Sequence, residues 1–296
     1  MIRGLPAVVS TYRTKGVEAV VPKAYLVDIP AIANTQVFED FQDQLALRDI
    51  VLSHAHDVEQ STELAMRLGS VLGSWVRYLH IWGAQDSCPG KSRGGKLQEK
   101  HSVQESSFDF YYGNPLQKSA AFPDILGECE DMFLQIKQQA AADVALWPSK
   151  EGFGMIHGDL STKNVLIQAE AELRRQKPRL VIIDWELAQL NSQLRDIAQL
   201  LADLFLLQYF EGAELAVSVM QGFLQGSHCS QPEELASLSV HVGLHLLLFD
   251  ITLPGPYPMD RINHLVSLAR DLVVAGWERD HQKLQLNEFW ALLRTV

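Results

Sequence analysis

The sequence predicts an α+β protein in which short β-strands come early and helices dominate the later part of the chain. Two early segments, 19–29 and 35–41, are rich in Val, Tyr and Phe and are bounded by Pro and Asn, which favours short strands. Later segments repeat apolar residues every three or four positions, the period of a helix packed on one face. No internal repeat is present, and 296 residues suffice for one large domain or two lobes.

Two helices are predicted after the early strands, over 58–82 and 123–145. The stretch 84–106 between them is polar and rich in Gly, Ser and Lys, which predicts an exposed, mobile loop. The apolar stripes that predict the helices comprise Leu64, Leu68, Val71, Trp75 and Leu79 in the first, and Ile125, Cys129, Met132, Ile136 and Ala140 in the second.

Two short apolar runs in the middle of the chain, Val165–Ile167 and Leu180–Ile183, are typical of β-strands. The polar segment QAEAELRRQKPR separates them, so we expect a hairpin of two strands joined by a turn. After Asn191 the pattern is helical to the end of the chain, apart from the proline-rich stretch ITLPGPYPMD.

The composition limits the classes of partner. The net charge is −11 and no basic tract is present, which argues against nucleic-acid binding and suits a cationic or neutral small substrate. Three scattered cysteines form neither a disulfide framework nor a paired-cysteine zinc site, and they indicate a reducing compartment. No segment has the length and apolarity of a signal-peptide core or a membrane span. We therefore expect a cytoplasmic protein with no membrane partner.

Three polar motifs follow one another and together predict phosphoryl-transfer chemistry. His157-x-Asp159-x-x-x-x-Asn164 precedes the first apolar run. Asp184 follows the second run, and Asp196 opens the next helical pattern. Phosphoryl transfer needs a carboxylate beside the attacking hydroxyl and hard oxygen ligands that hold Mg²⁺ against the nucleotide phosphates. The alternative is a helix cap, a turn residue and a strand-end charge with no shared role, but it requires three coincidences in order.

HGDLSTKN (157–164) and IDWE (183–186) resemble the signature of small-molecule kinases with the protein-kinase-like fold. These include the aminoglycoside phosphotransferases, the choline kinases and the methylthioribose kinases. The resemblance implies a reduced β N-lobe with the hinge over 1–45, and a mainly α-helical C-lobe with the catalytic loop over 46–296. The favoured function is therefore transfer of the γ-phosphoryl group of ATP to a hydroxyl of a small molecule.

The resemblance also implies roles for individual residues. Asp159 is the implied catalytic base, and His157 supports its loop. Asn164 and Asp184 are the implied magnesium ligands, so the implied cofactors are ATP and Mg²⁺. Asp196 matches a helix aspartate that steadies the catalytic loop.

Five further residues are candidates for nucleotide binding. Backbone groups of the hinge are expected to meet the adenine. Ser161 replaces the lysine that protein kinases commonly carry two residues after the catalytic aspartate, and Lys163 is the candidate to supply charge to a phosphate instead. The hinge residues are Glu39, Asp40 and Phe41.

A small-molecule acceptor is favoured over a protein acceptor. Gly158 replaces the Arg of the protein-kinase H-R-D motif, and Asp-Trp-Glu replaces D-F-G. Asp196 follows Asp184 after only twelve residues, which leaves little room for an activation loop and a peptide platform.

The nucleotide-clamping half of such a site is not found in the sequence. A Gly-rich loop and a strand lysine should precede the hinge, but Gly4 and Gly16 are isolated, and neither Lys15 nor Lys23 follows a Gly-rich hairpin. A catalytically impaired pseudokinase and a truncated fragment acting as a binding module therefore remain alternatives. A metal-dependent phosphoesterase is disfavoured, because no two-metal carboxylate cluster is indicated.

Three histidines outside the motifs are interpreted as structural. His241 and His245 lie four residues apart on an apolar helical pattern, but no H-E-x-x-H arrangement accompanies them. They are expected in the core or at the edge of a pocket. His80 is expected to pack at a helix end.

Overall fold

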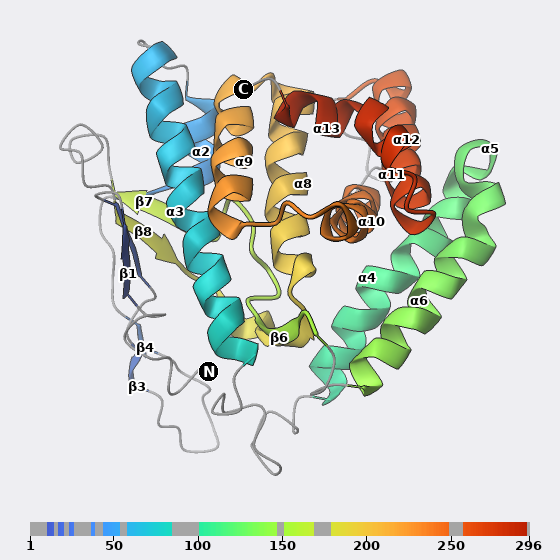
Figure 1. Ribbon diagram of the computed structural model, residues 1–296, viewed down its shortest axis with the longest axis horizontal. Coiled ribbons are helices and arrows are strands. Elements are labelled where there is room, and N and C mark those ends of the chain that lie inside the picture. Colours follow the sequence, from blue (N-terminus) through green and yellow to red (C-terminus); the bar gives the residue numbers. More distant parts are fainter. Residues whose placement is uncertain are drawn as a thin grey trace.

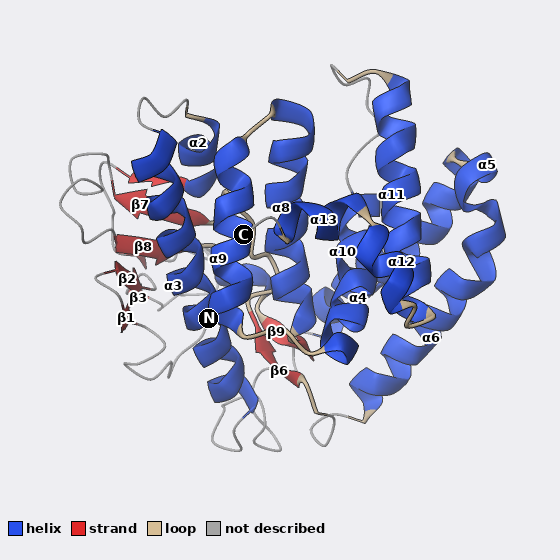
Figure 2. Ribbon diagram, turned by 45° about the horizontal axis from the view of Figure 1, so that its top comes forward, coloured by secondary structure: helices blue, strands red, loops and turns tan. Residues whose placement is uncertain are grey.

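The computed structural model of the protein has helices packed beside a small group of β-strands (Figure 1). Three long helices, α3, α9 and α8, run side by side, with β1, β2, β7 and β8 on one side of them and α4, α6, α11 and α12 on the other (Figures 1 and 2). The predicted α+β class is therefore confirmed. The residues that the structure describes are 11–14, 17–20, 24–26, 37–38, 44–53, 58–84, 101–146, 151–168, 179–248 and 257–294.

The largest sheet has five strands in the order β1-β2-β8-β7-β5. β2 and β8 are parallel, and the other neighbours are antiparallel. Pairing of Val165 with Ile182 and of Ile167 with Leu180 confirms the predicted hairpin, which is β7–β8. The strands are β1 (Thr11–Thr14), β2 (Val17–Val20), β5 (Gln44–Ala46), β7 (Val165–Gln168) and β8 (Arg179–Ile182).

Two further pairs of strands complete the β-structure. β3 (Ala24–Leu26) pairs with β4 (Val37–Phe38), and β6 (Phe153–Ile156) pairs with β9 (Gln189–Ser192). All four strands are short, and both pairs are antiparallel. The β6–β9 pair matters for function, because it places the residue before His157 beside the chain that follows Asp184.

The two early strand predictions correspond to parts of this β-structure. The range 19–29 overlaps β2 and β3, and 35–41 contains β4; the other residues of both ranges lie outside the described parts of the chain. The five-stranded sheet contains strands from both sides of residue 45. The proposed division of the chain at that residue stays a prediction.

The helices fill the rest of the described chain. The predicted helix 58–82 is α3, whereas the predicted helix 123–145 is divided into α5, a 3-10 turn η2 and α6. No helix within the described ranges is long and apolar enough to cross a membrane. The helices and 3-10 turns are α2 (Leu47–Leu52), α3 (Val58–Ala84), α4 (His101–Ala121), α5 (Pro123–Leu126), η2 (Gly127–Cys129), α6 (Glu130–Ala145), η3 (Trp185–Leu187), α8 (Leu194–Glu211), α9 (Glu214–Ser227), α10 (Pro232–Leu248), α11 (Met259–Trp277), α12 (His281–Leu286) and α13 (Glu288–Leu293).

The sequence does not predict α4, and the predicted loop over 84–106 is wrong for residues 101–106, where α4 begins. Residue 84 ends α3 and residues 101–106 are helical, while 85–100 lie outside the described residues. The helix contains Pro115 and no strong apolar stripe, so its local signal is weak. Tertiary packing stabilises α4 despite this weak local signal, because Tyr111 and Tyr112 are buried in the core.

Close packing of α3 against α9 depends on four glycines. A Cβ atom on Gly69 or Gly73 would lie 2.1 or 2.2 Å from a backbone carbonyl oxygen of α9. A Cβ atom on Gly222 or Gly226 would lie 2.0 or 2.1 Å from a carbonyl oxygen of α3. Each helix therefore presents two glycines, one turn apart, to the backbone of the other. This contact fixes α3, which carries His80 to the site described below.

Replacing Gly73 by Ala is expected to lower the free energy of unfolding by about 1–3 kcal/mol, because the added methyl group forces two helix backbones apart. Urea unfolding measures this change. Gly127→Ala is the matched control: it has helical dihedral angles and open space at its Cβ position, so its stability should stay equal or rise slightly. Equal stability of the Gly73 variant and wild type would contradict the packing argument.

Candidate functional site

The loop 157–164 between β6 and β7 is held in place by the carboxylate of Asp196. Asp196 is fully buried near the start of α8. Its Oδ2 accepts the backbone N–H of His157 at 2.8 Å, and its Oδ1 accepts that of Gly158 at 3.0 Å. Nε2 of His80, on α3, lies 3.2 Å from Oδ2. One carboxylate thus joins α3, the loop and α8.

The environment of Asp196 keeps it ionised. Burial alone would raise the pKa of this carboxyl group, but the hydrogen bond and charge of His80, helped by His157 and the N–H of Gly158, bring the pKa below its ordinary value. An ionised carboxylate is the form that can accept all of these hydrogen bonds at once.

His157 is the first residue of the loop, and its side chain is completely buried. Its Nδ1 accepts the backbone N–H of Asp159 at 3.3 Å, so its Nε2, 2.8 Å from the carbonyl oxygen of Ile183, must carry the proton. Burial lowers the pKa of His157, which agrees with this neutral form. The ring also packs 4.5 Å from the ring of Trp185. The side chain therefore links the Asp159 loop to the segment that carries Asp184.

The residue between His157 and Asp159 must be glycine. Gly158 has φ = 85°, which is unfavourable for residues with a side chain. A Cβ atom there would lie 2.2 Å from the backbone oxygen of Leu187. The Gly of the H-G-D motif therefore reflects close packing of the loop against η3.

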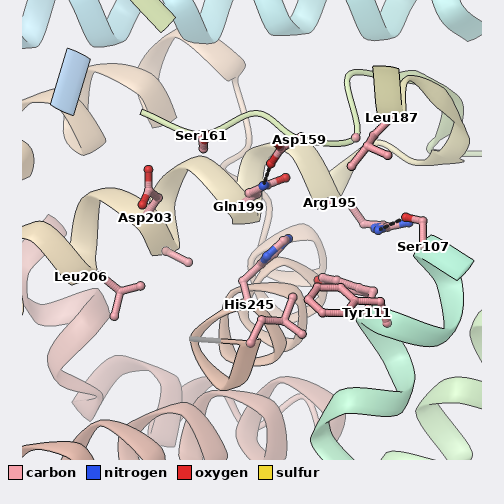
Figure 3. A pocket seen from close by; sticks show the side chains of 14 residues that line it. Ser107, Tyr111, Asp159, Ser161, Leu187, Arg195, Gln199, Asp203, Leu206 and His245 are labelled. Atoms are coloured by element: carbon pink, nitrogen blue, oxygen red, sulfur yellow. Dashed lines mark hydrogen bonds between the residues drawn. The ribbon is translucent and has the colours of Figure 1, made fainter. Parts of the chain in front are cut away.

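Asp159 places its carboxylate on the wall of a cavity of about 300 Å³ (Figure 3). Gln199 Nε2 donates to its Oδ1 at 2.6 Å, and Asn164 Nδ2 donates to its Oδ2 at 3.0 Å. These two donors fix the carboxylate. Each carboxylate oxygen has two lone pairs and can still accept a hydrogen bond from a ligand.

Asn164 and Asp184 lie at the same end of neighbouring strands. The pairing of β7 with β8 continues into a hydrogen bond from Ile183 N to Asn164 O at 3.0 Å, and Asp184 follows directly. Asp184 is exposed and has left-handed dihedral angles (φ 63°, ψ 60°), a conformation that Asp tolerates better than most residues. Neither side chain is part of the cavity wall that Asp159 occupies.

These two side chains fit a magnesium ion. Both hydrogen bonds of Asn164 Nδ2 go to oxygen atoms of Asp159, so the orientation of the amide is determined and Oδ1 faces away without a donor among the described residues. The described part of the chain contains no group of three or more His, Cys, Asp or Glu that could hold a metal. Mg²⁺ is commonly held by one or two carboxylates together with substrate phosphates, and Asp184 and Asn164 offer oxygen donors of this hard type.

The other predicted nucleotide-binding residues are less well defined. Ser161 lines the cavity, whereas Lys163 is exposed on the turn before Asn164 and does not. The hinge residues Glu39, Asp40 and Phe41 lie outside the described residues.

Helix α8 contributes three polar cavity residues that the sequence motifs do not include. Arg195, Gln199 and Asp203 lie in a row along α8 (Figure 3). Asp203 Oδ2 accepts the backbone N–H of Thr162 at 2.7 Å and its hydroxyl at 2.6 Å. The sequence carries a signal for them, because they recur at every fourth position of α8, although the helix also contains Asp196, Gln208 and Glu211.

His241 and His245, on α10, pack against Tyr111 near the same cavity. The ring of Tyr111 lies 6.0 Å from that of His241 and 4.7 Å from that of His245, and the Tyr111 hydroxyl donates to the backbone oxygen of His241 at 3.0 Å. His245 lines the cavity, which matches the expected place at a pocket edge. His80 is buried, as expected.

Asp196→Asn is expected to lower the free energy of unfolding by about 2–4 kcal/mol, because a buried charged acceptor is removed from its donors. Urea unfolding at pH 7 measures the loss. Asp271→Asn is the control, since Asp271 is exposed and its ion pair with Arg270 contributes little. A loss as small as that of the control would show that Asp196 does not anchor the loop.

Acid is expected to destabilise the fold through His241. Loss of hydration, and then the charge of Arg195, lowers the pKa of His241 to about 3. The unfolded chain binds a proton at this residue below its ordinary pKa of about 6.5, whereas the folded chain does not until about pH 3. Stability is therefore full above pH 6.5 and falls by roughly 1.4 kcal/mol per pH unit below it.

His241→Gln should remove this part of the acid sensitivity. Urea unfolding of wild type and variant at pH 7 and pH 4.5 gives the two slopes. His281→Gln, at an exposed position, should keep the wild-type slope. Identical slopes for wild type and the His241 variant would refute the assignment.

Comparisons with known proteins show the family to which the chain belongs. Residues 31–238 match the model of a family described as "Phosphotransferase enzyme family". Phosphotransferase FrzJ from Cladobotryum sp is 40% identical over 276 residues, which cover 92% of this chain and 70% of that protein. A 4-hydroxytryptamine kinase from Psilocybe cyanescens is 23% identical over 239 residues, which cover 77% of this chain and 59% of that protein.

Among solved structures, a choline/ethanolamine kinase family protein from Mesorhizobium loti aligns with a TM-score of 0.44 and 14% identity, over 90% of this chain and 79% of that one. The family model covers more than half of this chain, and the 40% identical relative is covered over more than two thirds of its length. The resemblance carried by HGDLSTKN and IDWE is thereby confirmed: the protein belongs to the phosphotransferase enzyme family.

Proposed function

We propose that this phosphotransferase moves the γ-phosphoryl group of ATP to a hydroxyl group of a small molecule. The observation that carries the proposal is the position of Asp159. Its carboxylate lines a cavity of about 300 Å³ and belongs to the loop that Asp196 anchors. A cavity of this size accommodates a small acceptor beside a fixed carboxylate.

Asp159 orients the acceptor hydroxyl and takes up its proton as the hydroxyl oxygen bonds to phosphorus. Gln199 and Asn164 keep the carboxylate in one position, so the acceptor is oriented before reaction. The His157 side chain fixes the backbone at Asp159 and at Ile183 through hydrogen bonds. Because His157 is completely buried, it does not touch the acceptor.

Asn164 and Asp184 hold magnesium in this proposal. A magnesium ion held there would supply positive charge that offsets the negative charge developing on the phosphates during transfer. The two side chains lie at one end of the β7–β8 pair, outside the cavity wall, so nucleotide and acceptor approach Asp159 from different sides. The exposed Lys163 is assigned to a phosphate, and residues 39–41 to the adenine.

The acceptor is a small molecule in this proposal. The segment between Asp184 and Asp196 is taken up by η3 and β9, and β9 is paired with β6. This short paired segment offers no platform for a peptide. Two relatives whose names identify them as 4-hydroxytryptamine kinases support a hydroxylated small molecule as acceptor.

A second candidate function is a binding module without catalysis. Residues 1–38 contain no Gly-rich loop followed by a strand lysine, and a protein without these elements would lack the phosphate clamp of a kinase. Such a protein would keep the cavity and would bind a small molecule without transferring phosphate.

The decisive experiment measures ADP formation from MgATP with a panel of small alcohols and phenols. Asp159→Asn should lower kcat by about 10²–10⁴-fold, because the general base is removed while the fold is kept. Asp131→Asn, exposed on α6, should retain wild-type turnover. Turnover that survives Asp159→Asn would refute the proposed mechanism, and binding of MgATP and an acceptor without any turnover would establish the binding module.

A further inference from the structure

Arg195 is a buried cation on the wall of the cavity. Its residue is 5% exposed, and its side chain lines the cavity from the first turn of α8. No ion pair of the described residues includes it. Its one polar side-chain contact there is a long one, from Nη2 to the hydroxyl of Ser107 at 3.5 Å, and Nε and Nη1 have no partner.

None of the described residues balances the charge of this arginine. Its guanidinium lies 4.3 Å from the centre of the Tyr111 ring, a cation–π contact that attracts the charge without neutralising it. A buried charge is costly unless it is paired and hydrogen-bonded. The side chain has five N–H donors, so most of its hydrogen-bonding capacity is unused.

The aromatic neighbours of Arg195 that the structure describes supply no negative charge. Burial raises the pKa of Tyr111, so its phenol stays protonated, and burial lowers the pKa of both His241 and His245, so their rings stay neutral. His245 Nε2, on the same wall, also lacks a partner.

The two carboxylates of the cavity are bound to other groups. Asp159 accepts from Gln199 and Asn164, and Asp203 accepts twice from Thr162. Neither forms an ion pair with Arg195 within the described parts of the chain.

Helix α8 sets the separation between Arg195 and the reacting carboxylate. Gln199, which holds Asp159, follows Arg195 by four residues, or about 6 Å along the helix axis. Figure 3 shows the guanidinium at one end of this row and the carboxylate of Asp159 above its middle. The wall also includes the apolar side chains of Phe110, Leu187, Leu206 and Leu248.

We infer that Arg195 binds an anionic group of the acceptor. The acceptor is a hydroxy acid with an apolar body, whose carboxylate lies about one helical turn from the hydroxyl that meets Asp159. The position of the hydroxyl rests on the proposed function, whereas the anion subsite rests on Arg195, Ser107 and Tyr111.

The inference is tested by binding, without ATP, using meta-hydroxyphenylacetate, the matching amide and meta-tyramine. Isothermal titration calorimetry with the full chain should show the acid binding at least tenfold more tightly than the amide or the amine. Arg195→Gln should remove the preference, and Arg195→Lys should keep part of it, because lysine retains the charge but not the fork of donors. Arg77→Gln, exposed on α3 and away from the cavity, should keep the full preference.

Equal affinity for acid and amide, tighter binding of the amine, or no binding of the acid to wild type would each overturn the inference. The wild-type comparison alone decides this, even if the Arg195 variants fail to fold. The result is independent of the turnover experiment, because no phosphate is transferred. If the wild-type protein shows turnover but no preference for the acid, only the anion subsite is refuted. If it prefers the acid but shows no turnover, only the phosphotransfer mechanism is refuted.

Discussion

The buried carboxylate of Asp196 is the interaction on which the rest of the site depends. It accepts two successive backbone N–H groups of the loop and also contacts His80 on α3. Loop backbone that enters the interior would otherwise leave these donors unpaired, at a substantial cost in free energy. The glycine contact between α3 and α9 supports this arrangement indirectly, since it fixes the helix that carries His80.

From this anchor, two parts of the chain fix the position of Asp159. The loop brings Asp159 to the cavity, and α8 brings the side chains that hold or face it. Asp203 fastens the far end of the loop through Thr162, and Gln199 fastens Asp159 itself. Because both residues come from one helix, the spacing of the cavity wall is that of helical turns.

The sequence predicted the local parts of this site and missed those that arise from packing. Short-range sequence patterns specify the spacing of Asp159 and Asn164 and the β7–β8 hairpin, so both can be predicted from the sequence. The partnership of Gln199 with Asp159 joins residues forty positions apart, and no local signal specifies it. Helix α4 was missed for the same reason: its own pattern is weak, and burial of Tyr111 in the core stabilises it.

The net charge of the chain and the local charge of the cavity favour different acceptors. A net charge of −11 suggests a cationic or neutral acceptor, but exposed charges farther away than about 8 Å are largely screened by salt at physiological strength. A buried guanidinium that lines a small cavity is screened much less, so its field dominates there. Arg195 therefore outweighs the acidic surface in deciding which end of an acceptor it meets. The same low polarity that keeps His241 and His245 neutral makes an unpaired Arg195 costly, and a bound carboxylate would relieve that cost.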